Sequence, residues 1–243
     1  IQIGSLTNWG TVSLNNTSSG AIPSSTQNYY GPEAYTNKGL WVFGRNISGQ
    51  LGLNNTNTPI LPTNEDNGDW TSLSPGNAFN MRIRADGTLW TCGTDPQSYG
   101  KLGNNTNTID YSSPIQVGSL TNWKQVSCGY NFTTAIKTDG TLWAWGWNLS
   151  GQLGNGSTSY YSSPVQVGAL TTWSQIACGY RHMAAIKTDR TLWMWGENDF
   201  GQLGLNFLNG RYSSPVQVGS LTNWKQIALN MTSTGAIKTD GSL

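Results

Sequence analysis

The sequence predicts an all-β fold, a β-propeller made of four-stranded blades with a repeat of about 51 residues. Two observations predict it. The chain repeats itself, because the segment at 113–123 returns at 163–173 and at 214–224. Each period also contains four short runs of β-forming residues separated by turn residues, and none of these runs has a helical periodicity.

The repeat places the whole chain, residues 1–243, in a single propeller region. Equivalent leucines stand at Leu40, Leu89, Leu142, Leu192 and Leu243, at steps of 49, 53, 50 and 51 residues. The approximate periods are 1–58, 59–113, 114–163, 164–214 and 215–243, the last of them truncated. Because the chain opens on a fourth strand and stops at the start of a third, we expect it to be part of a larger propeller.

One period shows how the residues define the strands. After Trp123 the strands are expected at 124–127, 133–137, 142–145 and 164–167. Asp139 and Gly140 are predicted to form a two-residue type I′ hairpin turn, because glycine readily adopts the positive φ that this turn needs. Pro164 is expected at the start of the fourth strand, where no ladder N–H group is required. One period later Arg190 replaces the turn glycine, at a conformational cost of about 1 kcal/mol.

Paired tryptophans in the third strand are predicted to form the core between blades. Trp143 and Trp145 stand two residues apart, and Trp193 and Trp195 repeat this spacing one period later. Residues i and i+2 of a strand point to the same face of a sheet. Both rings of each pair are therefore expected to fill the wedge between blades, and truncating Trp143 or Trp193 to alanine should cost roughly 3–5 kcal/mol.

The composition excludes several classes of function. Charged residues make up 10% of the chain, and 13 cations against 12 anions give a formal net charge of +1. The sequence has no electrostatic footprint for nucleic acid, and no apolar run approaches the length of a membrane span. The 12 tryptophans are too many for a disordered chain. We therefore expect a folded protein with no nucleic-acid partner and no membrane insertion.

The residues capable of chemistry form no recognisable catalytic or metal site. His182 is the only histidine, which excludes a histidine-rich metal site, and we interpret it as a packing and hydrogen-bonding residue. Cys92, Cys128 and Cys178 contain no Cys-x-x-Cys pair, and we interpret them as small buried hydrophobic residues. A disulfide between Cys128 and Cys178 would need Cα atoms within about 7 Å. The prediction is a non-enzymatic protein with no catalytic residues, no cofactor and no metal ligands.

The repeated motifs are specific enough to indicate a family. They read Cys-Gly-Tyr-Arg-His-Met-Ala-Ala-Ile-Lys-Thr-Asp at 178–189, Leu-Trp-Met-Trp-Gly-Glu-Asn-Asp-Phe-Gly-Gln-Leu-Gly at 192–204 and Ser-Ser-Pro-Val-Gln-Val at 213–218. These residues resemble the repeat of the regulator of chromosome condensation family, over nearly the whole chain. The resemblance implies a propeller, usually of seven blades. Its members include a guanine-nucleotide exchange factor, an ultraviolet photoreceptor and a β-lactamase inhibitor, so the fold alone does not fix the function.

The low-charge repeats also resemble those of bacterial surface proteins and tailed-phage virion proteins. We therefore predict a non-enzymatic structural or binding module of a virion, such as a tail fibre or other appendage, or of a cell-surface assembly. It would lie on an extracellular or virion surface, in an oligomeric context, and present its loops to other protein subunits or to a surface glycan. The alternative is a cytoplasmic or nuclear regulator that resembles an exchange factor for a small GTPase or a chromatin-binding propeller.

Two groups of loop residues are the candidates for binding. Both are rich in tyrosine and arginine, which are enriched in interface hot spots. The loops between first and second strands contain Tyr130, Asn131, Phe132, Tyr180, Arg181 and His182. The long loops before the fourth strand contain Tyr111, Tyr160, Tyr161, Phe207 and Arg211. The charged residues around the hairpin turns, such as Lys137 and Asp139, are expected to form a solvated ring of mixed charge.

Overall fold

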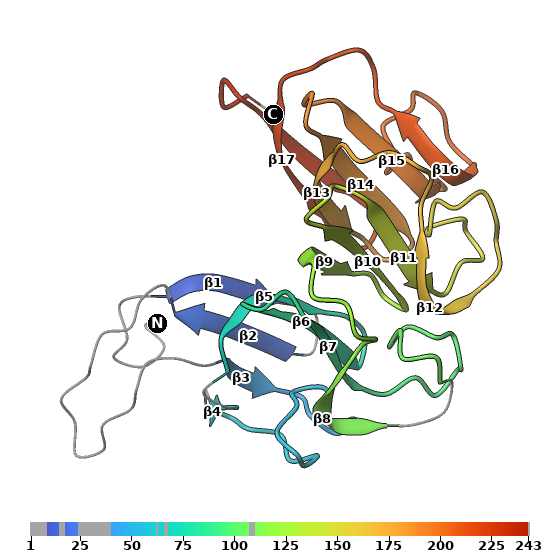
Figure 1. Cartoon of the computed structure of the whole chain (residues 1–243). Helices are drawn as coiled ribbons and strands as arrows, with labels where there is room; N and C mark the ends of the chain where they lie inside the picture. Colours follow the sequence, from blue (N-terminus) through green and yellow to red (C-terminus); the bar gives the residue numbers. More distant parts are fainter. Residues whose placement is uncertain are drawn as a thin grey trace.

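The computed structural model describes residues 9–14, 18–23, 40–61, 63–65, 68–106 and 110–242. Across these ranges every regular element is a β-strand, and 18 strands form five antiparallel sheets without any helix (Figure 1). The predicted all-β class is therefore confirmed. The strand predicted at the very start of the chain, and Leu243 at its end, lie outside the described residues.

The strands pair within each sheet in the order in which they occur in the chain. The first two blades contain β1 (Trp9–Leu14), β2 (Ser18–Pro23), β3 (Trp41–Gly44) and β4 (Thr63–Asn64), then β5 (Trp70–Pro75), β6 (Phe79–Arg84), β7 (Leu89–Gly93) and β8 (Tyr111–Gln116). The next two contain β9 (Trp123–Cys128), β10 (Phe132–Lys137), β11 (Leu142–Gly146) and β12 (Tyr161–Gln166), then β13 (Trp173–Cys178), β14 (His182–Lys187), β15 (Leu192–Glu197) and β16 (Arg211–Gln217). The described part of the fifth blade contains β17 (Trp224–Leu229) and β18 (Thr234–Lys238).

Consecutive blades pack through their first strands. β5 lies against β9, β9 against β13 and β13 against β17, so the first strands form the inner edge of an arc of blades (Figure 1). The Gln125 side-chain amide donates to the Ile176 carbonyl (3.2 Å) and accepts from the Ile176 N–H (3.3 Å). Gln175 accepts from the Ile227 N–H one blade later (3.0 Å). Bonds between side chains and backbone therefore fix each blade on the next.

The hairpin between second and third strands differs from the predicted type I′ turn. Gly140 has a φ of 79°, but Asp139 does not have the positive φ that a type I′ turn also requires. The Gly140 N–H donates to the Lys137 carbonyl, and the Lys137 N–H donates to the Thr141 carbonyl, both at 3.0 Å. The loop thus has three residues, and the Asp139 carboxylate holds it by accepting from the N–H and hydroxyl of Thr141 (2.9 and 2.7 Å). Arg190 takes the position of this glycine in the fourth blade with a φ of 64°, as predicted.

The fourth strand begins earlier than predicted. In β12, Tyr161 pairs with Gly146 and Val165 pairs with Ala144, with a shift of register between the two pairs. Pro164 therefore lies inside the strand and not at its start. The proline is tolerated because β12 is the outer edge strand of its blade and because the ladder is already irregular at this point.

Only one tryptophan of each third-strand pair is fully buried. Trp145 and Trp195 have no exposed surface. Their indole N–H groups donate to the Lys101 and Gln152 carbonyls of the preceding blade, at 3.1 and 2.9 Å. These two rings are the wedge residues that the sequence predicts, and each also supplies a hydrogen bond between blades.

Trp143, by contrast, is partly exposed at the turn end of its blade. Its ring meets Trp123 edge-on with centroids 6.1 Å apart, and its indole N–H donates to the Thr141 hydroxyl (2.9 Å). Lys137 Nζ lies 3.5 Å from the Trp143 centroid, and Lys187 lies at 3.6 Å over the equivalent ring of the next blade. Both lysines are buried. The prediction of a solvated charge ring is therefore wrong for Lys137 and Lys187, because their side chains pack on the faces of tryptophan rings.

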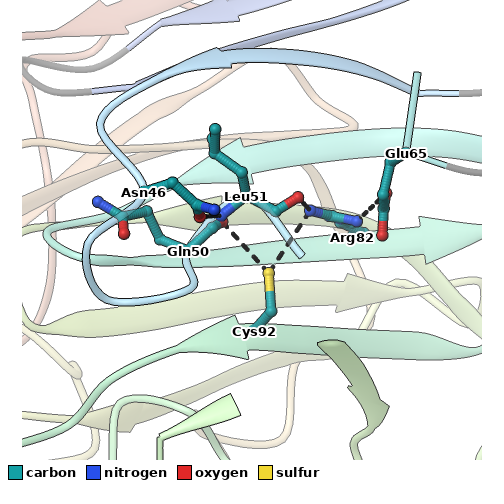
Figure 2. A network of polar contacts seen from close by, with 6 residues as sticks. All are labelled: Asn46, Gln50, Leu51, Glu65, Arg82 and Cys92. Carbon is teal, nitrogen blue, oxygen red and sulfur yellow. Dashed lines mark hydrogen bonds and ion pairs between the residues drawn. The ribbon is translucent and has the colours of Figure 1, made fainter. Parts of the chain in front are cut away.

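The boundary between the first and second blades is built differently (Figure 2). In the third blade, Trp145 and the small Ala135 fill the boundary with the second blade. In the second blade the register of the strands puts Cys92 and Arg82 at these two positions. The Cys92 thiol donates to the Gln50 carbonyl (3.2 Å), in the place of the bond that the Trp145 indole makes to its preceding blade. In the second blade the small residue, Cys92, therefore occupies the position of Trp145, and the large residue, Arg82, occupies the position of Ala135.

A buried ion pair completes this boundary. The Arg82 guanidinium pairs with Glu65 and donates to the Leu51 carbonyl (2.7 Å) and to Cys92 Sγ (3.5 Å) (Figure 2). The exposed fractions of the Arg82 and Glu65 side chains are 0% and 3%. Glu65 takes the position of Val117 at the next boundary, since their backbone N–H groups donate to the carbonyls of the equivalent leucines Leu40 and Leu89. Valine, alanine and tryptophan are thus replaced together by glutamate, arginine and cysteine.

Candidate functional site

Two kinds of loop lie together at one end of every blade. In an antiparallel meander the connections after the first and third strands lie at one end, and the hairpin after the second strand lies at the other. We call these ends the loop face and the turn face. Short first loops such as 129–131 and 179–181 lie toward the inner edge of the loop face, and long third loops such as 147–160 extend outward. Both predicted groups of binding residues lie at this end of the blades, but not all of them lie in loops. The residues that instead begin strands are Tyr111, Phe132, Tyr161, His182 and Arg211.

Two tyrosines from adjacent blades stack on the inner part of the loop face. The rings of Tyr130 and Tyr180 have centroids 4.2 Å apart and planes inclined at 33°. The Tyr130 N–H donates to the Tyr180 carbonyl (3.4 Å), and the Asn77 N–H donates to the Tyr130 carbonyl (3.2 Å). Burial and the neighbouring Tyr180 raise the pKa of Tyr130, although 37% of the Tyr130 surface is exposed. Equivalent loops of three blades are thereby connected.

Arg181 extends this stack outward. Its guanidinium carbon lies 5.0 Å from the Tyr180 ring centroid and 4.5 Å from the Trp147 ring centroid. Glu197 Oε1 accepts from Arg181 Nη1 at 3.3 Å, which neutralises the positive charge within the site. The Arg181 side chain keeps 35% of its surface exposed, whereas Glu197 is almost buried. The arginine is therefore held in place while one edge of it faces solvent.

Three further rings complete the group at the outer part of the face. The Trp147 indole N–H donates to the Tyr160 hydroxyl (3.1 Å). The Tyr99 ring lies 6.0 Å from Trp147 and 5.4 Å from Tyr160, between centroids. We call the continuous group of planar side chains the aromatic stripe. It consists of Tyr99, Tyr130, Trp147, Tyr160, Tyr180 and Arg181.

A buried asparagine shapes the long loop that carries part of the stripe. Asn148 Oδ1 accepts from the Leu153 N–H (2.9 Å), and Asn148 Nδ2 donates to the Ser157 and Ser159 carbonyls (2.9 and 3.0 Å). The equivalent asparagines of the first and fourth blades accept the same backbone bond from their own loops. This explains why an asparagine precedes each Gly-Gln-Leu-Gly motif, and the fully buried Asn148 amide serves its own loop.

In the second blade an aspartate and a lysine replace the asparagine and glutamine of this motif. Asp95 accepts several backbone N–H bonds of its loop, including that of Lys101 (3.2 Å). Lys101 Nζ donates to the Asn77 carbonyl (3.0 Å) and to Asn131 Oδ1 (3.1 Å). Burial lowers the pKa of Lys101 to about 8. The lysine joins the first loops of two neighbouring blades, and so supports the inner end of the stripe.

Three of the predicted binding residues lie beneath the surface. Asn131, Phe132 and His182 are buried. His182 Nε2 lies 3.2 Å from the Thr234 hydroxyl of the next blade, and burial lowers the pKa of His182 to about 4. These side chains hold the loops in position, and a partner on the intact loop face would not touch them.

The second predicted group divides in the same way. Tyr160 belongs to the aromatic stripe, whereas Tyr111 and Tyr161 are partly buried against the core of the second and third blades. Phe207 is 52% exposed on the long loop of the fourth blade. Arg211 is exposed, and its Nη1 donates to the Leu149 carbonyl (3.5 Å). The stripe therefore unites Tyr130, Tyr180 and Arg181 of the first group with Tyr160 of the second.

Exposed large apolar side chains concentrate on the loop face. Among the described residues, those on this face are Ile47, Ile60, Leu61, Tyr130, Leu149, Tyr160, Phe200, Phe207, Leu208 and Met231. Those at the other end are Leu120, Leu170 and Leu221, at equivalent positions before the first strands of three blades. Exposed large apolar side chains that gather on one face are typical of an interaction site.

Three contributors to the site were not predicted from the sequence. Trp147 continues the two-residue spacing of the third-strand tryptophans, and this spacing was the available signal for it. Tyr99 lies in the one long loop whose motif has lysine in place of glutamine, and no local pattern distinguishes it. Glu197 follows the glycine that ends the third-strand motif, and only its contact with Arg181 identifies its role.

The site offers stacking surfaces and hydrogen-bond donors, without an acid–base pair. In the part of the chain that the structure describes, no cluster of three or more His, Cys, Asp or Glu residues could hold a metal ion. The three cysteines are free thiols, and burial raises the pKa of Cys92 to about 11 and that of Cys178 to about 12. Within the same described ranges, no helix is long and apolar enough to cross a membrane.

Comparison with known proteins identifies the repeat. The family model described as "Regulator of chromosome condensation (RCC1) repeat" matches residues 86–136, 139–186 and 190–237. A second model of the same repeat matches 123–152 and 173–202. These matches cover more than half of the chain. The chain belongs to the RCC1 repeat family. The resemblance predicted from the repeated motifs is thereby confirmed.

Among RCC1-repeat relatives, the regulator of chromosome condensation of Xenopus laevis is 29% identical over 122 residues, which are 48% of this chain and 28% of the relative. The ultraviolet-B receptor UVR8 of Arabidopsis thaliana is 34% identical over 124 residues, which are 49% of this chain and 28% of the receptor. The similarity therefore spans just over a quarter of the length of each relative.

Solved structures of RCC1-type propellers share the fold. Human WBSCR16 superimposes with a TM-score of 0.82 at 19% identity, over 98% of this chain and 60% of that protein. Prp20p of Saccharomyces cerevisiae superimposes with a TM-score of 0.79 at 12% identity, over 97% of this chain and 58% of that protein. The predicted β-propeller is confirmed by these similarities and by the sheets described above.

Proposed function

We propose that this chain is a non-enzymatic docking module that binds a protein partner through its loop face. The observation that carries the proposal is the concentration of exposed apolar and aromatic side chains on that face. Aromatic residues and arginine are the side chains most often found in interface hot spots. Loops on a rigid β scaffold are common binding elements, because their sequence can vary without disturbing the core.

The relatives favour a regulatory protein as the partner. The structure of the yeast protein Prp20p is described together with its binding to Gsp1p and histones, and another structure shows the same protein bound to Kap60. These precedents support an intracellular regulator that resembles an exchange factor or a chromatin-binding propeller, located in the cytoplasm or nucleus. They support this alternative better than an appendage of a virion.

A subunit contact in an extracellular or virion assembly is the second candidate. The observation in its favour is that the cation of the aromatic stripe, Arg181, is already paired with Glu197. Charged residues are 10% of the whole chain, and a net charge close to zero favours self-association. The partner would then be another copy of this chain or a neighbouring subunit.

A binding assay with matched variants tests the docking proposal. The chain is immobilised and exposed to a purified small GTPase and, separately, to core histones, while sedimentation velocity measures self-association. A double variant of the loop face, Tyr130→Ala with Tyr160→Ala, is compared with a double variant of the turn face, Leu120→Ala with Leu170→Ala. We expect one of the three interactions to be saturable and to be weakened about tenfold or more by the loop-face variant alone.

Equal weakening by the two double variants would contradict the docking proposal, and so would the absence of all three interactions. Far-UV circular dichroism of each variant checks that the β fold is retained. The turn-face variant is a suitable control because its leucines have a similar degree of exposure to Tyr130 and Tyr160.

A further inference from the structure

We propose that the fifth blade binds a β-strand of a partner polypeptide, which pairs with β18 and inserts a tryptophan between the fourth and fifth blades. The bound strand has the pattern Leu-Trp-x-Trp-Gly, which β11 and β15 share. This inference is independent of the docking function proposed above, because it concerns a strand edge and a cavity and not the side chains of the aromatic stripe.

The outer edge of β18 is open in the part of the chain that the structure describes. The equivalent strands β10 and β14 each pair with a first strand on one edge and with a third strand on the other. β18 pairs with β17 alone. An edge strand presents backbone N–H and C=O groups that can pair with a strand of another chain. The registers of β10 and β14 predict that the two tryptophans of a bound strand lie opposite Thr234 and Ala236.

A cavity of about 590 Å³ lies beside this edge, between the fourth and fifth blades. Its lining includes the apolar side chains of Leu192, Met194, Leu203, Val218, Trp224 and Ala236. At the preceding boundary the equivalent residues form one core cluster with the buried Trp195. The cavity therefore corresponds to the space that a third-strand tryptophan fills at that boundary.

The glycine beside the cavity supports this correspondence. A Cβ on Gly154 would lie 2.6 Å from Trp195 Nε1, so the indole ring packs directly against that glycine. At the equivalent Gly204 the closest contact of a Cβ would be Val218 Cγ1, at 3.7 Å. Val218 is also only half-buried, whereas the equivalent Val167 is buried. The space next to Gly204 is thus open to an indole ring.

The cavity also contains the hydrogen-bond acceptor that an indole requires. In the third blade the Lys101 carbonyl accepts both from the Thr133 hydroxyl and from the Trp145 indole N–H, each at 3.1 Å. The equivalent Gln202 carbonyl accepts from the Thr234 hydroxyl (2.8 Å). A carbonyl oxygen has two lone pairs, so Gln202 can accept an indole N–H as well. This acceptor favours tryptophan over a purely apolar side chain.

The first tryptophan of the pattern has a place at the turn end of the blade. Lys137 Nζ lies 3.5 Å from the ring centroid of Trp143, the first tryptophan of its third strand. The equivalent Lys238 has the first-strand ring of Trp224 at 5.7 Å. A bound strand brings a second ring to Lys238, where a cation–π contact forms. Both tryptophans of the pattern therefore meet groups that suit them.

The donor of the strand is a different polypeptide and not a second copy of this chain. The third strands that the structure describes are β3, β7, β11 and β15, and each of them is paired on both edges within its own blade. A second copy would have to open one of its blades to donate such a strand. A partner with an unpaired strand of this pattern has no such cost.

Fluorescence anisotropy with strand peptides tests the proposal. The probe is a labelled peptide with the sequence of residues 140–146, flanked by lysines for solubility. The control peptide has alanine in place of the second tryptophan, which corresponds to Trp145. We expect saturable binding of the probe, and an affinity about tenfold or more lower for the control peptide, because it leaves the cavity unfilled.

Two variants of the chain form a matched pair. Ala236→Leu fills the cavity and should weaken binding of the probe about tenfold or more. Ala228→Leu makes the same substitution on the opposite face of the β17–β18 hairpin and should leave the affinity unchanged. Far-UV circular dichroism checks that both variants retain the β fold. The loop-face double variant should bind the probe like the wild type, so this proposal and the docking proposal stand or fail separately.

Amide hydrogen exchange locates the bound peptide. Exchange in segment 234–238 should slow when the probe binds, and protection confined to the loop-face segments would contradict the proposal. Absence of saturable binding, equal binding of the two peptides or an equal effect of the two leucine variants would also overturn it. Self-association of the chain that Ala236→Leu abolishes would show that the donor is a second copy, and the assignment to a different polypeptide would then be wrong.

Discussion

The buried ion pair at the first blade boundary leads to a quantitative prediction about stability. Replacing Arg82 alone by alanine leaves the Glu65 carboxylate buried without its partner. Breaking a buried pair in this way costs about 3–5 kcal/mol. Since a domain is stable by only about 5–15 kcal/mol, we expect Arg82→Ala to lower the urea midpoint strongly. Glu65→Val alone should be similarly harmful, because Arg82 is then the unpaired charge.

The triple variant Glu65→Val, Arg82→Ala, Cys92→Trp should behave in the opposite way. It recreates the apolar set that Val117, Ala135 and Trp145 form at the next boundary. The geometry supports the exchange, because a Cβ on Gly52 would lie 2.8 Å from Arg82 Nη2, and a Cβ on the equivalent Gly103 would lie 2.5 Å from Trp145 Nε1. Arginine and tryptophan thus occupy the same space.

We expect the unfolding free energy of the triple variant to lie between that of the wild type and about 4 kcal/mol above it. This is the range found when buried ion pairs are replaced by packed apolar residues. Urea unfolding followed by far-UV circular dichroism measures the wild type, the two single variants and the triple variant. If the triple variant is as unstable as Arg82→Ala, the three positions are not a compensated set, and our reading of this boundary is refuted.

Three further predictions concern single residues. Trp145→Ala should cost about 3–5 kcal/mol of unfolding free energy, and more than Trp143→Ala, because only the Trp145 ring is fully buried; equal losses in urea unfolding would contradict this. Arg190→Gly should raise the unfolding free energy by about 1 kcal/mol, because glycine adopts the observed φ of 64° without strain, and an unchanged urea midpoint would contradict it. The pKa of Lys101 is lowered to about 8, so between pH 8 and the ordinary lysine pKa the unfolded chain holds more protons than the folded chain. The unfolding free energy of the wild type, relative to Lys101→Met, should therefore rise with pH in this window by up to about 1.4 kcal/mol per pH unit, and a flat difference would refute the shift.

Much of the fold could be predicted because it depends on periodic local features. Strand pairing within each blade follows from alternating apolar residues and from turn residues at fixed spacing. Trp145 and Trp195 occupy the wedge that their spacing predicts. Trp143 lies on the same sheet face but nearer the end of its strand, where it is partly exposed. The two-residue spacing predicts the face of a side chain and not its position along the strand. The hairpin turn was misjudged because the Asp139 side chain, and not the glycine alone, determines the loop length.

The candidate site was less predictable because its contacts are formed between blades. Tyr130, Tyr180 and Tyr160 were suggested by residue type, but their union depends on Arg181 and Trp147, which come from different blades. The burial of His182 depends on the next blade, whose Thr234 lies beside its ring. The sequence alone predicted only a small buried hydrophobic residue at Cys92. The pairing of Arg82 with Glu65, which accompanies this cysteine, is visible only when two neighbouring blades are seen together.

Amide hydrogen exchange on the complex with the bound protein partner tests the docking claim most directly. With whichever of the small GTPase, the core histones or a second copy binds, we predict slower exchange in the loop-face segments 129–131, 147–160 and 179–181. The turn-face segments 138–141 and 188–191 should exchange at the same rate with and without the partner. Protection confined to the turn face, or spread evenly over both faces, would contradict the account.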